Sequence, residues 1–181
     1  TFEEKLEFLA SKYQKLSFYC IESLESSDYE ILCDSEIQIS LGSPWIFKQK
    51  DIEKASYLVH SHCTDLPKYR GGASTSWMLM SKYQKAAITI FRMNTGIDAG
   101  DLILKKNIVF PNNFSTPREY DDFIEKRFFN QLKKFIKDYD KSNHKKKEIK
   151  QDNSKAIYFP RLSSEENSWI NWNWTCNEIV Q

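Results

Sequence analysis

Segments with the alternating pattern of β-strands are interleaved with segments that have helical periodicity along most of this chain. Strand-like runs lie at residues 17–22, 37–41, 56–60, 86–93 and 102–110, and helix-like runs lie at residues 2–16, 45–55, 74–83 and 116–136. This alternation favours an α/β fold with a Rossmann-type, mostly parallel sheet and helices on both faces. Because ligands bind beyond the carboxyl ends of the strands in such sheets, we expect function to reside in the loops that follow strands.

The overall charge argues against two classes of partner. The chain has 181 residues and a formal net charge of +1, which gives no electrostatic reason to expect nucleic acid or an anionic membrane surface. No apolar run approaches the roughly 18 residues typical of a membrane span. The four cysteines show no C-x-x-C spacing, so we expect a reducing, cytoplasmic setting.

A lysine-rich stretch divides the chain into three parts. We expect residues 1–140 to form the core, residues 141–155 to form a solvated linker, and the aromatic residues 156–181 to pack on the core as an extension. The sequence begins at Thr1 without a methionine and stops at Gln181 inside a helix-like segment. We therefore expect one or both termini to be truncated and the extension to be incomplete.

The start of one long helix is marked in the sequence. Thr116 and Glu119 have the spacing of a capping box, with Pro117 at the first helical position. The apolar residues that follow are spaced to face inward along one side of this helix: Tyr120, Phe123, Ile124, Phe128, Leu132, Phe135 and Ile136.

Two of the three histidines lie in one short stretch, LVHSHCTDLPKYRGG, at residues 58–72. If the strand persists through residue 62, His60 and His62 project to the same side, because strand side chains alternate with a period of two. They could bind a divalent metal with a distant third ligand such as Asp65 or Asp98. They could equally be satisfied polar residues at a strand end, or an acid/base pair.

Asp98 is flanked by glycines in a loop that we place on the same rim of the sheet. A carboxylate near an imidazole raises the pKa of the imidazole and fixes its tautomer. The combination therefore favours proton transfer near neutral pH.

Several motifs in order resemble the folate-dependent formyltransferases, a family that includes methionyl-tRNA formyltransferase and the sugar N-formyltransferases. The family pattern N-x-H-x-S-L-L-P-x-Y-R-G is similar to HSHCTDLPKYRG, and its G-x-D-x-G-D loop is similar to GIDAGD. The segment ISLGSPWIF resembles the family's folate loop, and YFPRLSSEENSWINWNW resembles its R-x-x-x-E-D-x-x-I-D-W segment. The matching positions in the first two motifs and the strand between them are His62, Leu66, Pro67, Tyr69, Arg70, Gly71, Thr89, Met93, Gly96, Asp98, Gly100 and Asp101. The resemblance covers roughly residues 36–181.

This resemblance implies a formyltransferase-like fold, N10-formyltetrahydrofolate as the formyl donor, and catalysis by His60, His62 and Asp98 without a metal. One departure is His60, which stands where the family has an asparagine that donates a hydrogen bond to the developing oxyanion. Imidazole also carries an N–H, so the substitution is compatible with activity. A second departure is Thr64-Asp65 in place of serine-leucine, which adds a carboxylate.

The resemblance also implies two sets of binding residues. Those expected to hold the folate are Ser43, Pro44, Trp45, Met93, Gly96 and Ile97. Those expected to contact the acceptor are Asp65, Tyr69, Arg70 and Gly71. For Arg70 the alternative is that it pins the loop that follows Pro67.

We expect the acceptor to be an amino sugar, carried on a nucleotide, since no second basic domain for transfer RNA is evident. A homodimer is one option for the assembly. Three alternatives stay open: a catalytically impaired folate- or sugar-binding relative, a fragment of a methionyl-tRNA formyltransferase, and a metal-dependent hydrolase that uses the H-x-H pair.

Overall fold

A computed structural model describes residues 1–141 and 147–179 of the chain. The linker lysines Lys145 and Lys146, together with His144 and Gln181, lie outside the described residues. None of the described helices is both long and apolar enough to span a membrane. The elements, in chain order, are α1 (Phe2–Ala10), α2 (Ser27–Cys33), β1 (Gln38–Leu41), α3 (Gln49–Lys54), β2 (Leu58–His62), β3 (Arg70–Gly71), α4 (Ser74–Met80), β4 (Lys85–Arg92), β5 (Leu102–Val109), α5 (Pro117–Lys141), the 3-10 helix η1 (Asn153–Lys155), β6 (Tyr158–Phe159), α6 (Ser164–Asn167) and α7 (Cys176–Ile179).

The main sheet has four strands in the order β1-β2-β4-β5 and is mixed. β1 and β2 are parallel, whereas β2 pairs with β4, and β4 with β5, in the antiparallel sense. The α/β class is confirmed, but the expectation of a mostly parallel sheet is wrong. β4 and β5 are joined directly by the loop 93–101, which contains no crossover helix, and a parallel pair would need such a crossover.

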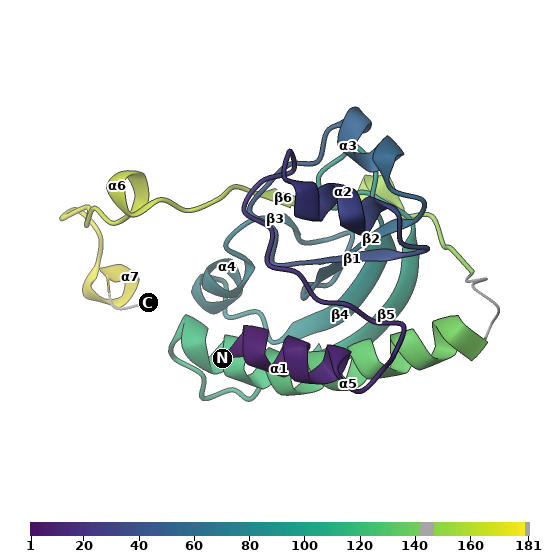
Figure 1. The fold of residues 1–181 in the computed structure, drawn as a ribbon. Coiled ribbons are helices and arrows are strands. Elements are labelled where there is room, and N and C mark those ends of the chain that lie inside the picture. Colours follow the sequence, from purple (N-terminus) through teal and green to yellow (C-terminus); the bar gives the residue numbers. More distant parts are fainter. Residues whose placement is uncertain (142–146, 180–181) are drawn as a thin grey trace.

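Helices cover both faces of this sheet (Figure 1). α1 and α5 lie along one face, and α2 and α3 lie over the other. β4 is buried from Ala86 through Phe91, as expected for a central strand covered on both sides. The buried residues of α5 recur every three or four positions and pack toward the sheet: Tyr120, Ile124, Phe128, Leu132, Phe135 and Tyr139.

The predicted start of α5 is confirmed in atomic detail. The Glu119 carboxylate accepts hydrogen bonds from the backbone N–H groups of Ser115 and Thr116, each at 2.9 Å. In contrast, the strand predicted at residues 17–22 does not form. Phe18 packs against the core, so its burial does not depend on strand pairing.

As far as the structure describes it, up to residue 179, the segment after the linker contacts the core only over its first residues. β6 pairs in parallel with β3, Phe159 stacks on Tyr69, and the Trp77 indole N–H donates to the Pro160 carbonyl at 2.9 Å. Beyond this point α6 and α7 lie away from the sheet (Figure 1). Trp169 and Trp172 are 79% and 82% exposed, so these tryptophans do not pack on the core as expected.

Candidate active site

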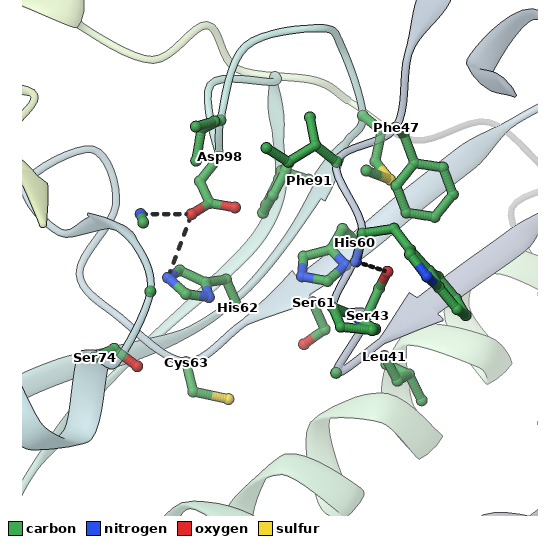
Figure 2. A pocket seen from close by; sticks show the side chains of 18 of the residues that line it. Leu41, Ser43, Phe47, His60, Ser61, His62, Cys63, Ser74, Phe91 and Asp98 are labelled. Carbon is green, nitrogen blue, oxygen red and sulfur yellow. Dashed lines mark hydrogen bonds and ion pairs between the residues drawn. The ribbon is translucent and has the colours of Figure 1, made fainter. Parts of the chain in front are cut away.

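A cavity of about 620 Å³ lies at the carboxyl end of β2. The strand persists through His62, so His60 and His62 face the same side, as the alternation predicts. The loop after β1 and the loop after β4 form two further walls, and the first turn of α4 and the second and third turns of α5 contribute as well. Figure 2 shows His60, His62 and Asp98 directed toward one another across this space.

His62 and Asp98 meet without forming a hydrogen bond. The distance from His62 Nε2 to Asp98 Oδ2 is 3.6 Å. The backbone N–H of Gly71 donates to the same carboxylate oxygen at 2.8 Å. His62 Nε2 is buried and has no hydrogen-bond partner among the residues that the structure describes. A buried donor or acceptor without a hydrogen-bond partner indicates a position where a substrate group can bind.

The loop that carries Asp98 is held by hydrogen bonds to its backbone and by a close approach of its backbone to β4. Asp98 has a φ of 48°, and the Gln151 side chain donates to the carbonyls of Asp98 and Gly100 at 2.8 and 2.7 Å. A Cβ atom at Gly100 would overlap the Arg92 carbonyl, so this close approach requires glycine. These contacts fix where the Asp98 carboxylate points.

His60 is oriented by β1, the neighbouring strand. The parallel register places Ser40 beside His60, and the Ser40 hydroxyl lies 3.1 Å from His60 Nδ1. The imidazole also packs edge-on against Phe91. When the hydroxyl donates to Nδ1, the proton of the neutral ring is on Nε2, which is then available as a donor in the cavity.

Burial controls the charge of both histidines. The pKa of His60 is lowered to about 4, mainly by burial and also by the nearby His62, while Asp98 opposes the change. Burial also lowers the pKa of His62, against the opposite effect of Asp98. Asp98 raises the pKa of both imidazoles, as expected, but desolvation of the charged ring is the larger effect and the net shift is downward. Both rings are neutral at pH 7.

All of the residues expected to bind folate line this cavity. They come from the loop after β1 and the loop after β4: Ser43, Pro44, Trp45, Met93, Gly96 and Ile97. Apolar side chains with adjacent backbone polar groups suit a flat heterocycle. The two loops are therefore brought together with the histidines, although they are far apart in the sequence.

Among the residues expected to contact the acceptor, the structure places only Gly71 at the cavity. Asp65 forms ion pairs with Lys105 at 2.5 Å and Lys68 at 3.7 Å. Tyr69 lies against the rings of Tyr83 and Phe159.

Arg70 likewise has a structural role. Its guanidinium donates to the side-chain oxygens of Gln151 and Asn153 at 2.9 and 2.8 Å. This geometry fits the alternative, in which Arg70 pins a loop, and the acceptor contact of Arg70 stays a prediction.

Sequence reasoning missed several residues that the structure brings to the site. Arg161 and Asp121 line the cavity, Ser40 orients His60, and Gln151 holds the Asp98 loop. Arg161 begins the R-x-x-x-E segment that the sequence shares with the family, so a signal for it was present. For Ser40 and Gln151, nothing in the local sequence indicated a role.

The fold is that of the formyltransferases. A methionyl-tRNA formyltransferase from Clostridium thermocellum superposes with a TM-score of 0.76 at 21% identity, covering 98% of this chain and 74% of that one. A sugar 3-N-formyltransferase, solved in the presence of dTDP and 5-N-formyltetrahydrofolate, superposes with a TM-score of 0.62 at 27% identity. That match covers 78% of this chain and 50% of that protein.

Sequence comparison leads to the same group. A methionyl-tRNA formyltransferase from Clostridium beijerinckii is 27% identical over 177 residues, which are 98% of this chain and 56% of that protein. No family model matches the sequence. Taken together with the structural neighbours, the sequence relatives support a relationship of the chain to the folate-dependent formyltransferases. It spans little more than half the length of this relative.

Proposed function

We propose that the chain is an N-formyltransferase that moves the formyl group of N10-formyltetrahydrofolate to the amine of an amino sugar, carried on a nucleotide. One observation carries this proposal. His62 Nε2 lies 3.6 Å from Asp98 Oδ2, buried and without a hydrogen-bond partner among the described residues, in the cavity whose other walls are the folate-type loops.

The chemistry requires a donor for a developing oxyanion and a base for one proton. The acceptor amine attacks the formyl carbon and a new C–N bond forms, giving a tetrahedral intermediate. Neutral His60 and His62 stabilise its oxygen through N–H groups. Asp98 orients His62 and takes the proton that the amine loses, while N10 of the folate gains a proton as its bond to carbon breaks. The remaining rate enhancement comes from holding the two substrates in the geometry in which they react.

The cavity chemistry favours a small phosphorylated acceptor. Arg161 lines the cavity, and a guanidinium binds phosphate oxygens through paired N–H donors. The sugar N-formyltransferase among the structural neighbours was solved with dTDP, a nucleoside diphosphate. The chain's formal charge of +1 offers no comparable support for transfer RNA.

Methionyl-tRNA is the second candidate acceptor, and the names of the sequence relatives favour it. Mass spectrometry separates the two after incubation with N10-formyltetrahydrofolate and each acceptor in turn. We expect one added formyl group on a dTDP- or UDP-linked amino sugar, and none with His62→Ala. Formylation of methionyl-tRNA and of no amino sugar would show that methionyl-tRNA, and not an amino sugar, is the acceptor. The absence of any product and of any tetrahydrofolate would contradict the proposal as a whole.

A further inference from the structure

His60, His62 and Asp98 form a cluster that the formyl transfer chemistry does not require. Each offers one ligand atom, and the three atoms lie within 4.8 Å of one another. Imidazole nitrogen and carboxylate oxygen are the ligands that zinc takes in open, three-residue sites. The cluster depends on His60, since the asparagine of the family pattern would leave a single histidine here.

The spacing is close to that of a metal site. Two ligand atoms on a tetrahedral zinc ion, each at about 2.05 Å, are about 3.3 Å apart. His62 Nε2 and Asp98 Oδ2 are already 3.6 Å apart. Small side-chain rotations would bring the third ligand atom to the same range, because no ligand atom is more than 4.8 Å from another.

A second observation points to a ligand at this position. His62 Nε2 is buried and aimed into the cluster, and it has no hydrogen-bond partner within the described part of the chain. Metal sites also need outer partners that orient their ligands. Here the Ser40 hydroxyl contacts His60 Nδ1 at 3.1 Å, and the Gly71 N–H donates to Asp98 Oδ2 at 2.8 Å. These contacts hold two of the three ligands in place.

We propose that His60, His62 and Asp98 bind one Zn²⁺ ion, and that the bound ion and the folate formyl group exclude each other. The ion would occupy the space into which His60 and His62 direct their ring nitrogens, which is where the proposed function requires the formyl oxygen. The exclusion rests on that proposed function, whereas the zinc site does not. Zinc therefore acts as a reversible inhibitor made possible by the histidine at position 60.

Isothermal titration calorimetry of the full chain tests the site without any need for turnover. The protein is stripped with a chelator and titrated with Zn²⁺ in a Cys20→Ser, Cys176→Ser background, because these two thiols are exposed and could bind zinc themselves. We expect one ion per chain. His60→Asn and Asp98→Asn should each weaken binding at least tenfold.

Two matched controls separate the cluster from other residues of the same type. Asp122→Asn removes an exposed carboxylate on α5, and His144→Asn removes the third histidine of the sequence. Both should bind zinc as the parent protein does. Equal zinc affinity in the parent protein and in His60→Asn would show that His60 is not a ligand and would contradict the proposed zinc site.

A competition experiment tests the exclusion separately. The same titration is repeated with 5-formyltetrahydrofolate at saturating concentration. We expect the apparent zinc affinity to fall at least tenfold. Unchanged zinc affinity, with folate binding verified in the same sample, would show that ion and folate bind together and would overturn the exclusion while leaving the zinc site standing.

Discussion

At the scale of single residues, His60 is where this chain departs most clearly from its family. Its ring is positioned by Ser40 and Phe91, so the histidine is built into the site. We predict that His60→Ala lowers the rate of formyl transfer about 10²- to 10³-fold, the usual cost of removing one oxyanion donor. His60→Asn restores an N–H donor and should keep a rate within a few-fold of the parent. Steady-state kinetics of tetrahydrofolate formation provide the measurement, and an alanine variant as active as the parent would exclude a donor role.

Burial of the two histidines also predicts how stability depends on pH. The folded-state pKa of His60, about 4, lies below the unfolded value of about 6.5, so the unfolded chain binds more protons in between. Stability is therefore complete above pH 6.5 and falls as the pH drops toward 4. We expect His60 to account for roughly 2 kcal/mol of this loss between pH 7 and pH 4.5. Urea unfolding at both pH values should show a smaller loss for His60→Asn, and equal losses would contradict the assignment.

The misplaced residues show what single-residue reasoning from sequence lacks. Asp65 looked like an extra carboxylate for the acceptor, but its oxygens are paired with lysines, one of them on β5. Ser40 looked like an ordinary strand residue, yet the parallel register places it beside His60. In both cases the deciding partner is distant in the sequence, so local spacing could not reveal it.

At the scale of elements, the pairing of β3 with β6 depends on a glycine. Gly71 has a φ of 108°, and a Cβ atom there would overlap the Phe159 carbonyl oxygen. We predict that Gly71→Ala lowers the melting temperature and impairs formyl transfer, because its N–H also anchors the Asp98 carboxylate. Gly42→Ala is the matched control, since Gly42 has a φ of 61° but no neighbouring atom within 4 Å. It should lose only about 1–2 kcal/mol, from backbone strain alone. A Gly71→Ala protein as stable as Gly42→Ala would contradict this account.

The loop between β4 and β5 depends on Gln151, which lies within the stretch 141–155 that was predicted to be a solvated linker. Gln151→Ala leaves the carbonyls of Asp98 and Gly100 without their donor. We expect a loss of about 1–3 kcal/mol in unfolding free energy and a fall in both turnover and folate affinity, because the same loop carries Asp98, Gly96 and Ile97 at the cavity. Gln49→Ala, which removes an exposed glutamine on α3, is the control for stability. Parental turnover in Gln151→Ala would show that Gln151 is not needed to hold this loop and would contradict the account.

At the scale of the whole molecule, periodicity predicted the elements better than their arrangement. The inward face of α5 was readable because burial on a helix repeats with a fixed period, and β4 was readable as a continuous run of β-branched and aromatic residues. The antiparallel pairing of β4 with β5 was implied by the short connection without a crossover helix, whereas the antiparallel pairing of β4 with β2 was not readable, because a strand carries no local signal of direction. The aromatic segment 156–181 was expected to pack on the core, but Trp169 and Trp172 are exposed, because an aromatic run carries no local signal of which surface it covers.

The most direct measurement of the central claim compares turnover and folate binding in Asp98→Asn, His62→Ala and the parent protein. Both residues act on the transition state, so we predict that tetrahydrofolate formation falls at least 10²-fold in each variant while the Kd for 5-formyltetrahydrofolate changes less than threefold. The asparagine can still accept the Gly71 N–H, which keeps the loop in place. Near-parental turnover in either variant would show that the formyl group reacts elsewhere and would contradict the account.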